Sequence, residues 1–336
     1  MKKKTKNLIL LIALFVVVCA GYFALDLLPE KTAEEEEPVE ETLKIADFTA
    51  EEIESYYYSN SEYEMGFYIT ENGYVHYEDE AFPVNTASVK AQLSAMESLT
   101  AVQKIDSTDK AEYGLDNPLI TLSITLIDGE QRNFLLGDST PLFEGHYLLD
   151  VENDTIYLAE ATLYLELDCS FSSMVQQEEK VKPAQEQIVD VTVETAGVTT
   201  MYISYDEAKE QPWQLTTPEG TFDGDTDAVT TALGAYSAYS LFSTVEYDCT
   251  DFSKYGLEEP VTTVTVRYTE EESGEIKSLL FEFGNIDTEN NDMAYVRVNG
   301  SSYVYGMSEY YSESVSVFDI EELKYVPAAD TSETTE

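Results

Sequence analysis

Apolar residues follow three different patterns along the chain, and each pattern predicts a different kind of structure. Residues 7–25 form one continuous run without a charged side chain. From position 43 onward, apolar and polar residues alternate in short segments bounded by turn residues, which is typical of antiparallel strands. One segment in each half of this region has apolar residues at helical spacing instead. The pattern predicts an N-terminal membrane span followed by a fold of the α+β class.

The leading apolar run predicts a transmembrane signal anchor at residues 7–28. A helix of this length is about 30 Å long, which matches the hydrocarbon core of a bilayer. Four lysines lie within residues 1–6, whereas the chain that follows the run is acidic. Because lysines are retained on the cytoplasmic side, we expect residues 1–6 in the cytoplasm and the bulk of the chain outside the cell membrane.

Two alternatives to an uncleaved anchor are compatible with the same residues. A secretory signal would use the apolar residues 8–18 and be cleaved near Val18-Cys19-Ala20. A lipoprotein would carry its lipid on Cys19, but the β-branched Val18 stands where such sites have a small residue. The apolar residues that continue to Leu28 favour the uncleaved anchor.

The region between residues 43 and 326 contains two copies of one unit. The motif Tyr-Gly-Leu-Asp-Asn-Pro at 113–118 recurs as Tyr-Gly-Leu-Glu-Glu-Pro at 255–260. Downstream, Phe-Leu-Leu-Gly-Asp at 134–138 recurs as Phe-Glu-Phe-Gly-Asn at 281–285. Markers in the same order indicate an internal duplication. We therefore expect repeat module 1 at residues 43–174 and repeat module 2 at residues 188–326.

Three segments outside the modules have compositions that disfavour a packed core. Residues 29–42 are rich in glutamate and contain two prolines, which predicts an acidic stalk. Residues 175–187 are rich in Gln, Glu and Lys and predict a linker between the modules. Residues 327–336 predict a disordered tail.

Each module is predicted to contain an antiparallel sheet with one helix packed on it. Asn85 or Thr86 can cap the helix of module 1, and Asp225 or Thr226 can cap that of module 2. The apolar stripes of the two helices are Val89, Leu93 and Met96, and Val229, Leu233 and Tyr236. The predicted strands are 53–59, 66–70, 74–77, 120–126, 132–136, 147–149 and 155–158 in module 1, and 191–194, 201–205, 213–216, 263–268, 278–283, 294–298 and 303–305 in module 2.

The repeated motif predicts a tight corner at the entrance to a strand. Glycine permits a turn that a β-carbon would oppose, and proline disfavours helix in the residue before it. The tyrosine and the leucine supply apolar mass that holds the turn against the sheet. The residues of this structural motif are Tyr113, Gly114, Leu115 and Pro118 in module 1, and Tyr255, Gly256, Leu257 and Pro260 in module 2.

An acidic residue stands at the fourth position of both motifs. Asp116 and Glu258 are candidate ligand contacts if the corner is a binding loop, and simple turn residues if it is not. Trp213, the single tryptophan, is a third candidate contact. The 25 tyrosines are compatible with contact surfaces for a protein or a glycan, although tyrosine also fills half-buried sheet positions well.

The charge balance limits the partners of this protein. The chain has 66 acidic and 18 basic side chains, and its formal net charge is −48. Module 1 has a net charge of −20 and module 2 of −21, so the acidity is shared evenly. Because binding to a polyphosphate needs clustered cations, nucleic acid is excluded as a partner. Another envelope or transporter protein with a basic surface is the partner that we expect.

The sequence offers little catalytic or metal chemistry, and we expect neither an enzyme nor a cofactor. It has no Gly-x-Ser-x-Gly elbow, zinc-protease helix or phosphate-binding loop. Asp223, Asp225 and Asp227 are weak calcium candidates, because their spacing differs from that of an EF-hand and helix capping explains Asp225. Cys169 and Cys249 leave a disulfide between the modules open, with unlinked thiols as the default.

The anchor, the stalk and the tandem Tyr-Gly-Leu-Asp/Glu-x-Pro unit resemble a bacterial membrane-anchored family of unknown function, number 4340. The resemblance covers both modules. Members of that family resemble accessory envelope proteins, some of them encoded beside ABC-type export or gliding-motility components. The resemblance implies a place in the cell envelope and a protein partner there. It implies no catalytic residues.

The sequence therefore predicts a non-enzymatic, single-pass protein whose two extracytoplasmic modules bind another envelope protein. An accessory role beside an ABC-type transporter fits this prediction. The alternative is an extracytoplasmic sensor that binds a ligand or a glycan in a cleft between the modules, with Trp213 and nearby tyrosines in its lining.

Overall fold

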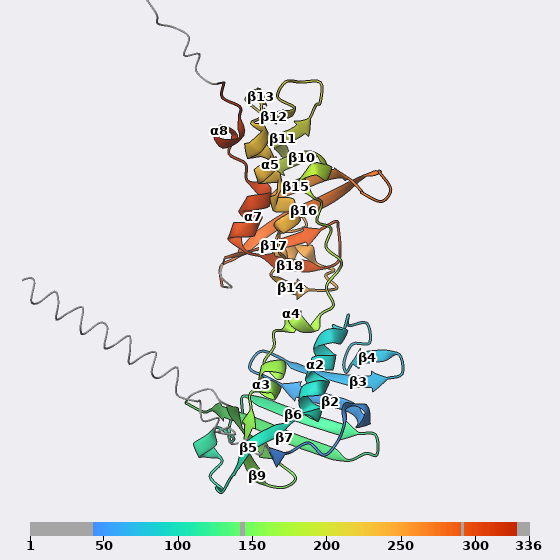
Figure 1. Cartoon of the computed structure of the whole chain (residues 1–336), viewed down its shortest axis with the longest axis vertical. Coiled ribbons are helices and arrows are strands. Elements are labelled where there is room, and N and C mark those ends of the chain that lie inside the picture. The colour runs from blue at the N-terminus through green and yellow to red at the C-terminus, as the bar shows by residue number, and fades with distance from the viewer. Residues whose placement is uncertain (1–42, 142–144, 290–291, 328–336) are drawn as a thin grey trace, which may run out of the picture. The chain divides into compact units, whose positions relative to one another are not determined.

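The computed structural model describes residues 43–141, 145–289 and 292–327 (Figure 1). The predicted span at residues 7–28, the predicted stalk and residues 328–336 of the predicted tail lie outside these ranges. Among the helices within them, none has both the length and the apolar character needed to cross a membrane. Antiparallel sheets and short helices form the described part of the chain, which is therefore of the α+β class.

Module 1 is built on a nine-stranded antiparallel sheet. Its strands are β1 (Leu43–Lys44), β2 (Ile53–Ser59), β3 (Glu64–Thr70), β4 (Gly73–His76), β5 (Thr100–Ile105), β6 (Ile120–Leu126), β7 (Gln131–Ser139), β8 (Gly145–Asp150) and β9 (Thr155–Glu160). They lie in the order β1-β5-β9-β8-β7-β6-β2-β3-β4.

Module 2 has a second nine-stranded antiparallel sheet. Its strands are β10 (Ile188–Thr195), β11 (Val198–Tyr205), β12 (Trp213–Thr217), β13 (Gly220–Asp223), β14 (Ser243–Glu246), β15 (Thr262–Thr269), β16 (Ile276–Asp287), β17 (Met293–Val298) and β18 (Val304–Met307). They lie in the order β13-β12-β11-β10-β15-β16-β17-β18-β14.

The two sheets have the same topology. Read from β14 to β12, the order of the second sheet matches the order of the first from β5 to β4, strand for strand. The first sheet adds β1 at one edge and the second adds β13 at the other. The internal duplication predicted from the sequence is thus present in the connectivity of the fold as well as in its motifs.

Short helices accompany both sheets. Those of module 1 are η1 (Ala50–Glu52), α2 (Thr86–Glu97), η2 (Ala111–Tyr113), α3 (Thr162–Leu167) and α4 (Phe171–Met174). The linker contains η3 (Gln185–Gln187), and module 2 contains α5 (Thr226–Leu233), α6 (Ala235–Ala238), η4 (Phe252–Tyr255), α7 (Glu309–Ser316) and α8 (Ile320–Leu323). The prediction of one helix per module is therefore too simple.

The main helix of each module begins at a predicted cap. The Asn85 side chain accepts a hydrogen bond from the Ala87 amide, and the Asp225 side chain accepts from the amides of Asp227 and Ala228. These bonds satisfy amides that have no partner within the helix. The predicted helix of module 2 is divided at Gly234 into α5 and α6, so Tyr236 lies in the second piece.

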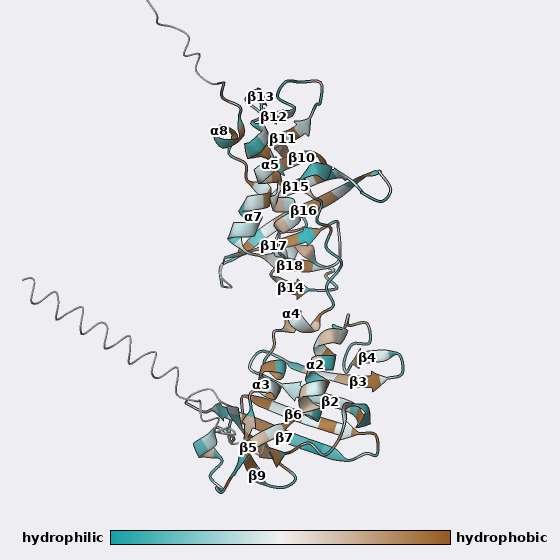
Figure 2. Ribbon diagram, in the orientation of Figure 1, coloured by the Kyte–Doolittle hydropathy of each residue, from teal (hydrophilic) through white to brown (hydrophobic). Residues whose placement is uncertain are grey.

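The core of each module lies between one sheet face and its helices. Along β6, Ile120, Leu122, Ile124 and Leu126 are buried, while the residues between them are more exposed. Figure 2 shows hydrophobic residues on the strands that α2 covers. Several tyrosines that were considered as contact surfaces are instead fully buried: Tyr56, Tyr58, Tyr236, Tyr239 and Tyr305. Burial of such large side chains favours folding by roughly 2 kcal/mol each.

Candidate functional site

The repeated motif of module 1 forms a corner that rests on a strand bulge. Gly114 follows η2 with a φ of 71°, a left-handed conformation that glycine adopts at low cost. The pairing of β7 with β8 shifts register between Leu136 and Ser139, and Gly137 lies in this bulge. A β-carbon at Gly137 would collide with the carbonyl oxygen of Tyr113. Only glycine at position 137 therefore allows the corner to pack against the bulge.

Module 2 repeats this arrangement. Gly256 follows η4 with a φ of 69°, and the pairing of β16 with β17 shifts register at Gly284. A β-carbon at Gly284 would collide with the carbonyl oxygen of Tyr255. One at Gly256 would lie 2.5 Å from the side-chain oxygen of Asn285. The two copies of the motif thus position the backbone in the same way.

The apolar residues of the motif hold each corner against its sheet. Leu115 is buried in a small cluster with Leu149 and Ile156, and the ring of Tyr113 lies 4.6 Å from that of Tyr147. In module 2, Leu257 is buried with Cys249 and Val304, and the rings of Tyr255 and Tyr295 are 4.9 Å apart. The tyrosine and leucine side chains of both motifs are therefore used for packing.

The acids and prolines of the motif lie at the outer side of the corner. Asp116 and Glu258 are exposed, and Pro118 and Pro260 are half-buried two residues before β6 and β15 begin. The carboxylates are therefore accessible to a partner, while the prolines lead the chain into the next strand.

The weak calcium candidates have other roles in the structure. Asp225 caps α5, and the Asp223 carboxylate accepts a hydrogen bond of 2.9 Å from the Gln214 side-chain amide. Asp227 is exposed in the first turn of the helix. Within the described ranges, no group of three His, Cys, Asp or Glu side chains is arranged to hold a metal ion.

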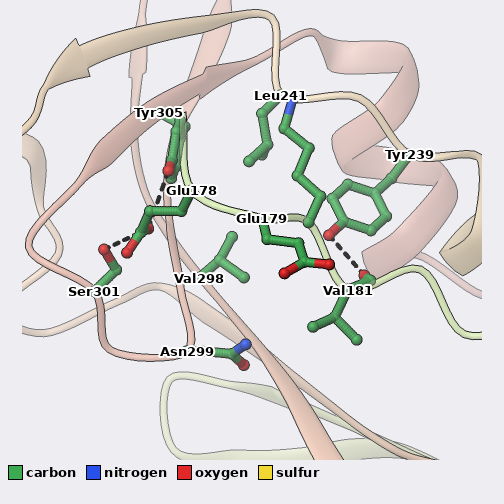
Figure 3. A pocket seen from close by; sticks show the side chains of 10 residues that line it. Glu178, Glu179, Val181, Tyr239, Leu241, Val298, Asn299, Ser301 and Tyr305 are labelled. Carbon is green, nitrogen blue, oxygen red and sulfur yellow. Dashed lines mark hydrogen bonds between the residues drawn. The ribbon is translucent and has the colours of Figure 1, made fainter. Parts of the chain in front are cut away.

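The linker forms a cavity where it crosses module 2, and we call this the linker cavity (Figure 3). Its volume is about 170 Å³. Ser301 and the Tyr305 hydroxyl both donate to the Glu178 carboxylate, at 2.6 and 3.0 Å. The Tyr239 hydroxyl donates to the backbone carbonyl of Val181 at 2.9 Å. The linker is thus held against module 2 through its backbone and one acidic side chain.

Burial controls the electrostatics of the linker cavity. It raises the pKa of Tyr239 to about 12 and also raises that of Tyr305, where Glu178 adds to the effect. Burial lowers the pKa of Lys180, and the neighbouring Lys182 adds to this shift. Both tyrosines are therefore neutral hydrogen-bond donors at ordinary pH. These hydroxyl groups hold the linker against module 2. The small volume of the cavity leaves little room for a ligand.

Trp213 lines a second, larger cavity at the start of β12, which we call the Trp213 cavity. Its volume is about 320 Å³. The other residues in its lining come from the linker, from β10 and β11 and from α5: Gln185, Glu186, Ile188, Tyr205, Thr226 and Thr230. The Trp213 cavity therefore lies within module 2 and its linker. The structure does not bring Trp213 together with Asp116 or Glu258 in this lining.

Cys169 and Cys249 are free thiols in the structure. The Cys169 carbonyl accepts a hydrogen bond of 2.6 Å from the Tyr63 hydroxyl. Burial raises the pKa of the Cys249 thiol, with the Glu246 carboxylate as the next cause, so this thiol is protonated and unreactive at neutral pH.

Sequence reasoning missed the hydroxyl groups that hold the linker. From the sequence, Tyr239 and Tyr305 are two of many tyrosines that fit either a contact surface or half-buried sheet positions, and Tyr305 also ends the predicted strand 303–305. Their partners lie 58 and 127 positions away along the chain, so no local pattern connects them. The one available signal was the placement of Tyr239 directly after the helical stripe that ends at Tyr236.

The chain matches the model of one known family. A family model described as a domain of unknown function (DUF4340) matches residues 75–234 and again residues 213–322. The first match begins in β4 and the second in the equivalent strand β12, so both start just ahead of a module's main helix. No curated protein and no solved structure matches the chain. The two matches together cover well over half of the chain, which therefore belongs to the DUF4340 family and carries its unit in tandem.

Proposed function

We propose that this protein is a non-enzymatic, single-pass membrane protein of a bacterial cell envelope, and that its two extracytoplasmic modules bind another envelope protein. A component of an ABC-type transporter is the partner class that the family resemblance favours. The apolar run at residues 7–28 would supply the anchor, and the lysines before it would keep residues 1–6 in the cytoplasm.

The observation that carries this proposal is the excess of carboxylates on a duplicated sheet fold. If each of the 18 basic side chains paired with one acid, 48 acids would still lack a cationic partner. The arginines of the described sheets are already engaged: Arg132 with Asp150, Arg267 with Asp190, and Arg297 with Glu282. The modules therefore present a negative field that favours a basic partner.

The geometry of the repeated motif supports a role in binding rather than catalysis. Its glycines, tyrosines and leucines are occupied by the corner and the bulge in both modules. Both copies leave a carboxylate exposed at the fourth position of the motif, Asp116 or Glu258. A surface acid repeated on two equivalent corners offers paired contacts to one basic partner.

Purification of the full-length chain in a mild detergent tests this proposal. At low salt, we expect one membrane protein with a basic extracytoplasmic surface to be recovered reproducibly. The yield should fall as salt screens the interaction, because the Debye length shortens from about 30 Å at 0.01 M to about 10 Å at 0.1 M salt. Failure to recover any partner in replicate low-salt preparations would contradict the proposal.

A second candidate function is an extracytoplasmic ligand or glycan sensor. The Trp213 cavity favours it, although this cavity lies inside module 2 rather than in a cleft between the modules. Binding of the intact protein to a glycan array tests this candidate, and an array without any binder removes its glycan form.

A further inference from the structure

The Trp213 cavity contains a corner made of two aromatic rings. Tyr205 and Trp213 are paired across β11 and β12, and their ring centroids are 5.1 Å apart with an angle of 72° between the ring planes. Trp213 is only 6% exposed, whereas Tyr205 is 52% exposed. The buried indole thus forms a fixed wall, and the phenol forms an outer wall that faces solvent.

Residues with oxygen-bearing side chains complete the lining of the cavity. Glu186 brings a carboxylate from η3, and Gln185 brings an amide from the same short helix. Thr226 and Thr230 bring two hydroxyl groups from one side of α5. No lysine or arginine is among the residues that line this cavity. Two aromatic rings, a carboxylate and neutral oxygens are the groups that attract an organic ammonium ion.

The charges around the cavity also favour a positively charged ligand. Module 2 has a net charge of −21. The nearby Lys209 binds the side chain of Gln214, which lies on the opposite face of β12 from Trp213 because successive side chains of a strand alternate. The first amides of α5 are satisfied by the Asp225 carboxylate, which also offsets the positive end of the helix dipole.

The aromatic corner is present in module 2 and absent from module 1. Equivalent residues of the two sheets can be identified from matching bulges, which follow Ile53 in β2 and Ile188 in β10. In this alignment Ile69 and Tyr74 of module 1 occupy the positions of Tyr205 and Trp213. Both module 1 residues pack against their core as ordinary apolar side chains. The same topology is therefore stable without the corner.

We propose that the Trp213 cavity is a binding site for an organic ammonium ion, with Tyr205 and Trp213 as its aromatic walls and Glu186 as its counter-ion. Its volume of about 320 Å³ is at the small end of the range for small-molecule sites, about 300–1,000 Å³. Such a cavity suits a single ammonium group with a short substituent. This site exists in the isolated chain and does not depend on the protein partner proposed above.

The single tryptophan of the chain makes this site directly observable, because all tryptophan fluorescence comes from Trp213. The full-length protein in a maltoside detergent, which contains no ammonium group, is titrated with choline and with its neutral isostere 3,3-dimethyl-1-butanol. We expect a saturable change in fluorescence with choline and at least about tenfold weaker binding of the neutral isostere. Equal responses to both compounds, or no saturable response to choline, would overturn the proposal.

A third titration, with N-acetyl-lysine methylamide, distinguishes the sources of the ammonium group. Saturable binding of this compound identifies the ammonium group as that of a lysine side chain of a protein. Binding of choline without binding of the lysine compound identifies it as that of a free small molecule. Both results support the ammonium site.

Two substitutions in exposed side chains test the assigned residues without disturbing the core. Tyr205→Leu removes one aromatic wall, and Glu186→Gln removes the counter-ion while keeping the shape of the side chain. We expect each to weaken choline binding by roughly tenfold. Tyr68→Leu in module 1 and Glu219→Gln in module 2 are matched controls outside the cavity and should leave binding unchanged. Unchanged affinity in both test variants would refute the assignment.

Discussion

Gly137 lies so close to the carbonyl oxygen of Tyr113 that position 137 has no room for a β-carbon. Gly284 stands in the same relation to Tyr255 in module 2. This contact explains why the Tyr-Gly-Leu corner and the Gly-Asp or Gly-Asn pair occur together in both modules. The two sequence markers of the repeat are the two halves of one tertiary contact.

Substitution Gly137→Ala should therefore destabilise module 1 through steric overlap alone, because the φ of Gly137 is not positive. We expect a loss of about 3 kcal/mol in the free energy of unfolding. Gly129→Ala is a matched control: its φ is 88° but a β-carbon there meets open space, so the expected loss is only about 1 kcal/mol. Urea unfolding of the full chain followed by circular dichroism compares the two, and equal losses would contradict the proposed overlap.

The helix of module 2 should tolerate no charge on its buried side. Leu233 is fully buried in the core, so Leu233→Asp would bury an unpaired carboxylate and cost about 4 kcal/mol. Leu165 in α3 is 67% exposed, and Leu165→Asp should change the stability by less than about 0.5 kcal/mol. Thermal unfolding of both variants measures this difference. A small effect at Leu233 would show that α5 does not pack as described.

The linker should open locally more often when its hydrogen bond to Tyr239 is removed, although Ser301 and Tyr305 still hold Glu178. Tyr239→Phe deletes the hydroxyl that donates to the Val181 carbonyl and should cost about 1 kcal/mol. This corresponds to roughly fivefold faster amide hydrogen exchange around residues 178–182. Tyr310→Phe, at a position that is 75% exposed, serves as the control. Equal exchange in both variants would mean that the linker does not depend on this bond.

His76 should make module 1 less stable at mildly acidic pH. Burial lowers its pKa below the ordinary value of 6.5, although the carboxylates of Glu78 and Asp79 oppose this shift in part. Its Nδ1 atom accepts hydrogen bonds from the amides of Glu78 and Asp79, at 3.3 and 3.2 Å, which requires the neutral ring. Because the unfolded chain binds the additional proton more readily, stability is complete above pH 6.5 and declines as the pH falls below it.

The effect of His76 is small because the ring is half-exposed and water screens it. We expect about 0.5 kcal/mol or less between pH 7 and pH 5. In His76→Asn, the side-chain oxygen can accept the same amides without titrating, so stability should vary less over this interval. Urea unfolding at several pH values measures the difference. A slope that is unchanged in His76→Asn would assign the pH dependence to other groups.

Local sequence patterns predicted those elements that are stabilised by local contacts. The strict alternation of residues 120–126 predicted β6 with its correct bounds, since one face of this strand is buried and the other is not. Asn85 and Asp225 were predicted as caps because their chemistry acts within one helical turn. The turn glycines at 114 and 256 were predicted because their left-handed conformation is a local requirement, whereas their close contacts with Asp138 and Asn285 could not be read from the local pattern.

Elements that depend on distant partners were missed. In the strand β5 (Thr100–Ile105), apolar and polar residues do not alternate, and only Ala101 is buried. This strand forms because it pairs with β9. The strand β14 pairs with β18 in the same way. The docking of the linker could not be predicted either, because its composition is polar and the hydroxyls that hold it come from α6 and β18 and their surroundings.

The central claim is that an anchored, duplicated acidic fold works outside the cell membrane by binding another protein. The most direct measurement is crosslinking of intact cells with a membrane-impermeant, amine-reactive reagent, for which Lys90 on α2 provides an exposed target. The account predicts that this protein reacts in intact cells and is joined reproducibly to one membrane protein with a basic outer surface. A protein that reacts only after the cells are broken, or that reacts without joining any partner, would contradict the account.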